Sequence, residues 1–109
     1  MKKDGVVVRF LLGAQDTLDT VENVDAHIYL ADGSQRHATF FTTKAIDELL
    51  RKNVRTGEAG RGSYFWCSDQ VIVPAPGMKG MMAAIMWMIR SGEIEVMCSL
   101  IEDGHDPAC

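Results

Sequence analysis

The chain has 109 residues, of which 47% are hydrophobic and 24% are charged, and its formal net charge is −4. This length fits one domain, residues 1–109, and this composition excludes a disordered chain. No apolar run approaches the roughly 18 residues that a membrane-spanning helix needs, and the acidic balance argues against contact with a nucleic-acid backbone. We therefore expect a soluble single domain that binds neither membranes nor nucleic acid, with a frayed tail at residues 101–109.

The first apolar segment, VVVRFLL at 6–12, predicts a strand because it is short and rich in β-branched residues. Its expected inner side carries Val6, Val8, Phe10 and Leu12, and Arg9 lies on its outer side. Two lysines precede the segment, as in a signal peptide, but Arg9 interrupts the run and no small-residue cleavage site follows. We expect a cytoplasmic protein.

The three cysteines, Cys67, Cys98 and Cys109, form no C-x-x-C spacing, and an odd number cannot pair completely within one chain. Reduced thiols, as found in a cytoplasm, are therefore expected.

Residues 23–41 predict a β-hairpin, because apolar and polar residues alternate on both sides of Asp32-Gly33. A two-residue loop would mix the two faces. A three-residue loop at 31–33, with Gly33 left-handed, keeps the apolar residues together and places His27 opposite His37.

Thr42 then suits the N-cap of a helix that ends near residues 55–57. Its expected core stripe consists of Ile46, Leu49, Leu50 and Val54. The glycine-rich stretch 57–63 is expected to be irregular. The following block 64–73, YFWCSDQVIV, predicts either a hairpin turning at Ser68-Asp69 or one kinked strand.

Residues 76–90, PGMKGMMAAIMWMIR, predict a second helix, started by Pro76 and ended by Gly92. Its apolar face is formed by Met78, Met81, Met82, Ile85 and Ile89. The opposite face carries small residues around one large aromatic side chain, which favours close approach by another chain. We expect a homodimer interface at Gly80, Ala83, Ala84 and Trp87.

Residues 93–100, EIEVMCSL, alternate and predict a last strand. The expected order is therefore β-ββ-α-ββ-α-β. This order predicts an α+β domain with a mixed or antiparallel sheet of about five to six strands and two helices packed on one face.

The block Tyr64-Phe65-Trp66-x-Ser68-Asp69-x-Val71-Ile72-Val73 resembles a group of small uncharacterised bacterial proteins that share a YFW-x-SD-x-VIV pattern. The resemblance spans about residues 24–100 and consists of core residues. It implies no particular activity and suggests an accessory role on a mobile genetic element.

The candidate sites include the following three. His27 and His37, with Asp25 beside them, could share a metal ion, although an exposed polar sheet face explains them as well. Cys67 could be a nucleophile, but its aromatic and acidic neighbours favour a buried thiol. Tyr64, Trp66 and Met82 could line an apolar pocket between the sheet and the methionine-rich helix.

No acid, base and nucleophile set emerges from these residues, and no cofactor is expected. The sequence therefore favours a non-enzymatic binding or accessory protein that acts as a homodimer or through another protein partner. The first alternative is a domain that binds a small apolar ligand. The second is an enzyme that uses Cys67 or His37.

Overall fold

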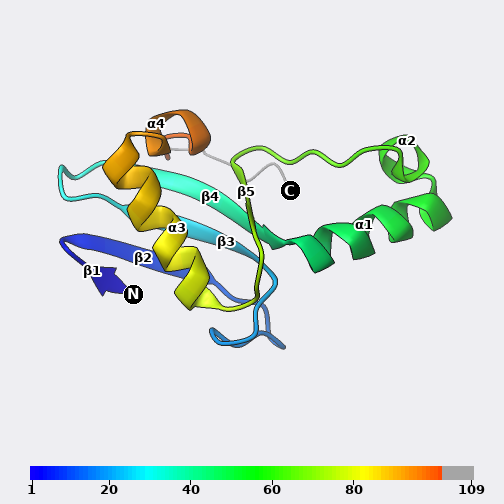
Figure 1. Ribbon diagram of the computed structural model, residues 1–109, viewed down its shortest axis with the longest axis horizontal. Helices are drawn as coiled ribbons and strands as arrows, with labels where there is room; N and C mark the ends of the chain where they lie inside the picture. The colour runs from blue at the N-terminus through cyan, green and yellow to red at the C-terminus, as the bar shows by residue number, and fades with distance from the viewer. Residues whose placement is uncertain (102–109) are drawn as a thin grey trace.

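A computed structural model describes residues 1–101, in which five strands form one sheet in the order β1-β2-β3-β4-β5 (Figure 1). The first four strands pair antiparallel and β5 pairs parallel with β4, so the sheet is mixed. The predicted α+β class and mixed sheet are confirmed. The elements are β1 (Lys2–Lys3), β2 (Val6–Leu11), β3 (Asn23–Tyr29), β4 (Gln35–Thr42), α1 (Thr43–Thr56), α2 (Glu58–Gly62), β5 (Gln70–Val73), α3 (Met78–Ser91) and α4 (Ile94–Met97).

The register of the β3–β4 hairpin agrees with the three-residue loop. His27 pairs with His37 and Tyr29 pairs with Gln35. Gly33 has a φ of 90°, the left-handed conformation that the loop requires. This register sends every second residue of the hairpin toward the core and the others toward the opposite face of the sheet.

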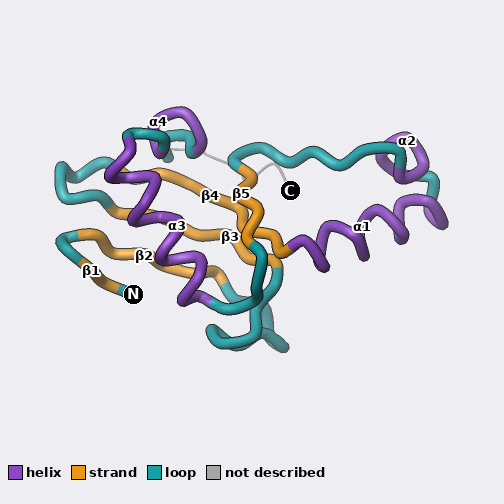
Figure 2. Tube along the Cα trace, viewed as in Figure 1, coloured by secondary structure: helices purple, strands orange, loops and turns teal. Residues whose placement is uncertain are grey.

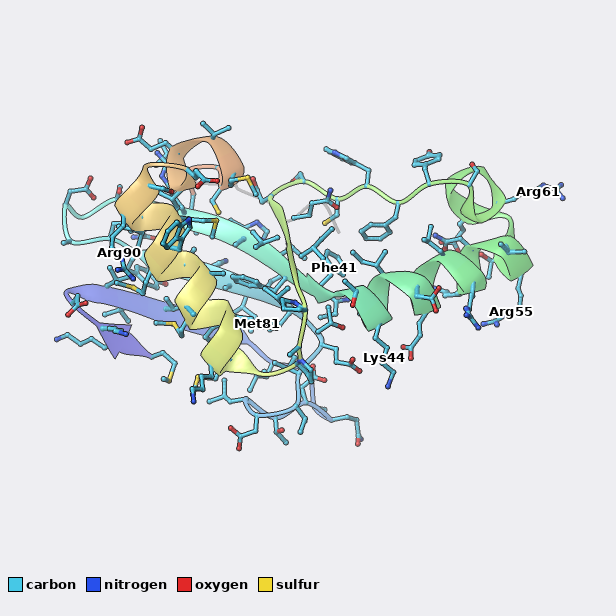
Figure 3. All side chains as sticks on the ribbon, in the orientation of Figure 1. Phe41, Lys44, Arg55, Arg61, Met81 and Arg90 are labelled. Atoms are coloured by element: carbon cyan, nitrogen blue, oxygen red, sulfur yellow. The ribbon has the colours of Figure 1, made fainter. Side chains whose placement is uncertain are left out.

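Helix α3 covers one face of the sheet (Figure 3), and its Met81 is fully buried in the core. Its inner residues Met81, Met82 and Ile85 are buried as predicted. The helix begins at Met78, two residues later than the expected start at Pro76, and ends before Gly92 in the left-handed conformation. The core also contains Val6, Val8, Val24, Ala26, Ile28, Ala38, Phe40, Val71, Val73, Met86 and Met88.

Helix α1 does not share the face that α3 covers. It follows β4 without a connecting loop, so the helix continues outward from the end of the strand (Figures 1 and 2). Thr42 caps it as predicted, because its Oγ1 accepts a hydrogen bond from the Ala45 N–H at 3.0 Å. Only Ala45 and Asn53 are buried in this helix. The expectation of two helices on one face is therefore wrong for α1, which with α2 forms a projecting arm.

The expected last strand at 93–100 is a short helix, α4. Ile94 and Cys98 are buried, whereas Val96 between them is 89% exposed. A strand would place all three on one side, but a helix places only residues four apart together. The Arg36 Nη1 donates a 2.7 Å hydrogen bond to the Cys98 carbonyl at the end of α4, which favours the helical conformation there.

Two other segments also differ from expectation. The glycine-rich stretch contains α2, whose last residue is Gly62. In the block 64–73 only β5 is a strand, and residues 64–69 run back from the arm to the sheet without regular structure. Both alternatives for this block, a hairpin and one kinked strand, are therefore wrong for residues 64–69. Figure 2 shows this segment, residues 64–69 (the return segment), running from α2 back to β5 beside α1.

Strand β4 shares its outer edge between two partners. Beside its second half lies β5, with Thr39 paired to Gln70. Beside its first half lies the chain after α4, where Arg36 bridges Leu100 and the Ile101 N–H donates to the Gln35 carbonyl at 2.8 Å. The two partners meet next to His37.

Candidate functional site

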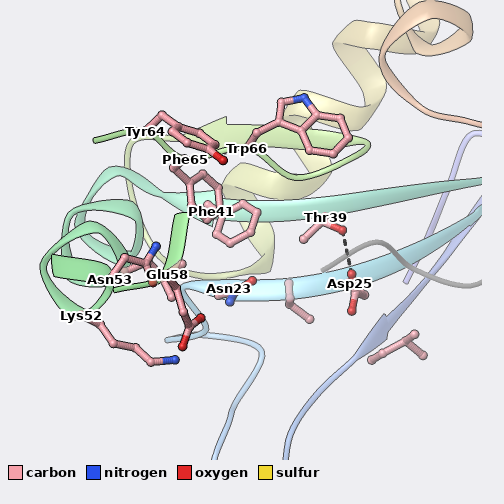
Figure 4. A pocket seen from close by; sticks show the side chains of 13 residues that line it. Asn23, Asp25, Thr39, Phe41, Lys52, Asn53, Glu58, Tyr64, Phe65 and Trp66 are labelled. Carbon is pink, nitrogen blue, oxygen red and sulfur yellow. Dashed lines mark hydrogen bonds between the residues drawn. The ribbon is translucent and has the colours of Figure 1, made fainter. Parts of the chain in front are cut away.

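A cleft of about 540 Å³ lies between the arm, the return segment and the sheet face that α3 does not cover (Figure 4). The side chains that reach it from β4 alternate with the core residues of that strand, so the cleft and the methionine core lie on opposite faces. Its lining residues are Leu11, Asn23, Val24, Asp25, Thr39, Phe41, Leu49, Lys52, Asn53, Glu58, Tyr64, Phe65 and Trp66.

Aromatic side chains form one wall of the cleft. Phe41 is buried at the end of β4, and the Phe65 ring meets it edge-on with the centroids 4.9 Å apart. The neighbouring Tyr64 and Trp66 are 59% and 69% exposed. Large aromatic side chains are mostly buried in folded proteins. The exposed rings of Tyr64 and Trp66 therefore offer a surface on which a ligand can stack.

The other wall of the cleft comes from α1 and α2, and it is more polar. Lys52 and Asn53 lie in α1, and Glu58 opens α2 (Figure 4). Asp25 and Thr39 lie on the floor, where the Thr39 Oγ1 donates a 2.7 Å hydrogen bond to Asp25 Oδ1. The cleft therefore combines an aromatic wall with a small set of polar groups, the usual character of a small-molecule site.

Next to the floor, His37 lies between two carboxylates. Its Nδ1 is 3.0 Å from Asp69 Oδ2 and its Nε2 is 3.2 Å from Asp25 Oδ1, while its own side chain is fully buried. Each ring nitrogen of His37 thus faces one carboxylate oxygen, and a nitrogen that carries a proton donates it to the carboxylate that it faces.

Asp69 connects this histidine to the chain after α4. Its Oδ1 accepts the Ser99 N–H at 2.9 Å, and its Oδ2 accepts the Ser99 hydroxyl at 2.7 Å. Burial alone would raise the pKa of Asp69, but the hydrogen bonds from His37 and Ser99 lower that pKa below its ordinary value. Asp69 thus holds together the two segments that share the edge of β4.

These groups do not form a catalytic triad. In a triad the nucleophile donates to the imidazole, whereas the Ser99 hydroxyl donates to Asp69. The imidazole of His37 is fully buried, so a substrate in the cleft would meet Asp25 and Thr39 before it met the ring. The arrangement fits a structural network that supports the floor of the cleft.

The structure places the predicted pocket residues on different faces. Tyr64 and Trp66 both line the cleft. Met82 is buried in the core beneath α3, on the other side of the sheet. The cleft that these aromatics line is therefore bounded by α1 and not by the methionine-rich helix.

His27 and His37 lie opposite each other as the register predicts, with ring centroids 6.0 Å apart. Within residues 1–101 no group of three or more His, Cys, Asp or Glu residues is arranged to hold a metal ion.

Three of the four predicted interface residues lie on the outer side of α3, whereas Ala84 packs against the core. Gly80, Ala83 and Trp87 are exposed and Ala84 is half-buried. Trp87 is 65% exposed, and a Cβ added at Gly80 would meet no atom within 4 Å.

The described cysteines differ from one another. Cys67 is buried and disulfide-bonded, so the expectation of reduced thiols is wrong for this residue. Cys98 is a buried free thiol, and burial first, with the Asp69 charge second, raises its pKa to about 11. Neither cysteine has the character of an activated nucleophile.

Sequence reasoning missed Asn53 and Asp69. Asn53 lies three residues after Leu50 and four after Leu49, which places it on the predicted apolar stripe of its helix. A polar residue at such a position was the available signal. Asp69 gave no comparable signal, because its role depends on Ser99, thirty residues later.

No known protein family, characterised protein or solved structure matches this chain. None of the helices within residues 1–101 is long and apolar enough to cross a membrane.

Proposed function

We propose that this chain is a non-enzymatic binding protein that holds a small ligand in the aromatic cleft beside α1. The observation that carries the proposal is the exposure of Tyr64 and Trp66 at a cleft of about 540 Å³. Small-molecule sites usually have volumes of about 300–1,000 Å³ and combine apolar walls with a few polar groups. The lining of this cleft has that composition.

The state of the polar groups supports binding over catalysis. Asp25 Oδ1 already accepts a hydrogen bond from the Thr39 hydroxyl and lies 3.2 Å from His37 Nε2, so this oxygen is engaged within the protein. The buried His37 ring is occupied at both nitrogens by carboxylates, so it is poorly placed to exchange a proton with a ligand.

Trp66→Ala is expected to weaken the binding of small aromatic compounds by about tenfold, because one stacking surface is lost. Indole and adenine are suitable probes, and ligand-observed NMR measures their dissociation constants. Trp87→Ala removes the other exposed tryptophan, which does not line the cleft, and should leave the affinities unchanged. Absence of binding to the wild-type protein, or an equal loss in both variants, would contradict the cleft as the site.

Self-association through the outer side of α3 is a second candidate role. Trp87 is more than half exposed among small residues, and such a surface permits close approach of a second helix. A homodimer built on Gly80, Ala83, Ala84 and Trp87 would leave the cleft free, because none of these residues lines it. An accessory role through another protein could use the same surface.

The dimer is tested by light scattering. The wild-type protein should have twice the mass of the chain, and Trp87→Glu should reduce it to the monomer because a charge would be buried in the interface. Val96→Glu places the same charge at an exposed apolar residue of α4 and should leave the mass unchanged. A wild-type monomer at high concentration would rule out this interface.

A further inference from the structure

Asn53 is a buried polar residue whose side chain has no partner. It is only 7% exposed, it lies in the second half of α1, and it lines the cleft. Its backbone carbonyl accepts the Gly57 N–H, but its amide group makes no hydrogen bond to another described residue. The amide is not among the enclosed unpartnered atoms, which are Arg36 Nε and Gln70 Oε1. The group is therefore accessible from the cleft.

The unpartnered amide of Asn53 costs free energy while the cleft is empty, and a ligand that pairs with the amide would remove this cost. Buried polar groups are almost always hydrogen-bonded, and asparagine is a poor residue for the interior of a helix. A leucine would fit the apolar stripe of α1 better, since the neighbouring stripe positions Leu49 and Leu50 carry that residue. An amide at this position gains its hydrogen bonds when a ligand occupies the cleft.

The chemistry of the walls indicates what the amide would meet. An asparagine side chain offers a donor and an acceptor side by side, which match a neighbouring acceptor and donor on the edge of a heterocycle such as adenine. Tyr64 and Trp66 also line the cleft, and their exposed rings offer surface on which a flat molecule can stack. In Figure 4 the Phe41 and Phe65 rings lie between Asn53 and the Trp66 ring.

The charged side chains select against an anionic ligand. The cleft is lined by two carboxylates, Asp25 and Glu58, and by one ammonium group, Lys52. A phosphate would be repelled by this balance, whereas an uncharged ring would not.

We propose that the cleft binds an uncharged, planar heteroaromatic molecule of the purine type, whose donor–acceptor edge pairs with the Asn53 amide while its ring stacks on Tyr64 or Trp66. This inference rests on the proposed binding function of the cleft. It adds the class of ligand and the residue that reads the ligand's polar edge.

The test compares adenine with indole, a flat bicyclic molecule of similar size that lacks an adjacent donor–acceptor pair. Affinities for both are measured by calorimetric titration with the full chain. Adenine should bind more tightly than indole. Asn53→Leu should weaken adenine binding by about tenfold, the loss expected for one or two hydrogen bonds, and leave indole binding unchanged.

Stability measurements control for folding. Urea unfolding of Asn53→Leu should show equal or greater stability than the wild type, because an unpartnered buried amide is removed. Asn53→Ala, which keeps a strong helix former, provides a second variant with the same expected loss of adenine binding.

The outcomes separate the two levels of the proposal. If neither compound binds, the binding function of the cleft is itself wrong. If indole binds as tightly as adenine, or if Asn53→Leu weakens both equally, the cleft binds ligands but the assigned class is wrong. Tighter binding of adenosine monophosphate than of adenosine would overturn the preference for an uncharged ligand. Tighter binding of N-acetylphenylalaninamide than of adenine would indicate a peptide ligand instead.

Discussion

Asp69→Asn is expected to destabilise the protein by about 2–3 kcal/mol, because the carboxylate of Asp69 accepts a partly buried hydrogen bond from His37 and two exposed ones from Ser99, each strengthened by the negative charge. Asparagine has the same size as aspartate and tolerates the φ of 60° found at this residue. The change in stability therefore measures the loss of the negative charge and of hydrogen-bond acceptors at residue 69, and it contains no contribution from backbone strain. Urea unfolding at pH 7 measures the difference.

The same variant has a defined pH dependence. Since the pKa of Asp69 is lower in the folded than in the unfolded chain, its carboxylate stabilises the fold fully above about pH 4. That contribution disappears as the pH falls through the lower, folded-state pKa. The stability gap between wild type and Asp69→Asn should be constant from pH 7 to pH 5 and should shrink below about pH 4.

Asp32→Asn is the matched control. Asp32 also has a lowered pKa, caused by hydrogen bonds from Ser34 in the hairpin loop, but the residue is fully exposed. We expect little change in stability from this substitution. An effect of Asp69→Asn no larger than that of Asp32→Asn would show that the network beside the cleft contributes nothing to the fold.

Met81→Ala is expected to lower the free energy of unfolding by about 3 kcal/mol, the typical cost of removing a fully buried methionine side chain. Met81 is completely inaccessible between α3 and the sheet. The truncation would leave a cavity in the core between α3 and the sheet.

Two further variants of α3 test whether the loss of stability comes from the volume removed on the buried side of the helix. Met81→Leu nearly conserves the volume and should cost less than about 1.5 kcal/mol. Trp87→Ala removes a larger side chain from the exposed side of α3 and should change the stability of the monomer by about 0.5 kcal/mol or less. If both alanine variants had equal effects, the inner and outer sides of α3 would be wrongly assigned.

Sequence patterns predicted the elements whose signals are local. The Asp32-Gly33 turn and the alternation around it fixed the whole β3–β4 register, because one loop length alone keeps the apolar residues on one face. Thr42 and Gly92 marked helix ends through the chemistry of single residues. A similar signal at Asp4-Gly5 was overlooked, and this turn joins the short β1 to β2.

The remaining features depended on information that is not local. The segment with Ile94, Val96 and Cys98 was ambiguous, because residues four apart lie on the same side of both a strand and a helix. The hydrogen bond from Arg36 to the Cys98 carbonyl, which comes from a distant strand, favours the helix. The core stripe of α1 was expected to lie on the sheet, but the absence of a loop after β4 directs this helix outward. The cleft arises from that direction, so the sequence could indicate its aromatic residues but not its location.

The order of the strands along the chain has consequences for folding and for partial unfolding. Strands β1 to β4 pair with their neighbours in sequence through the connections 4–5, 12–22 and 30–34, whereas β5 joins β4 only after the longer connection through residues 43–69. Closing the longer connection costs more chain entropy, so the meander of β1 to β4 should assemble early and the arm with β5 should dock late. Partial unfolding would then detach the arm first. A ligand bound beside α1 would stabilise the docked arm, so a higher ligand concentration would make this detachment rarer.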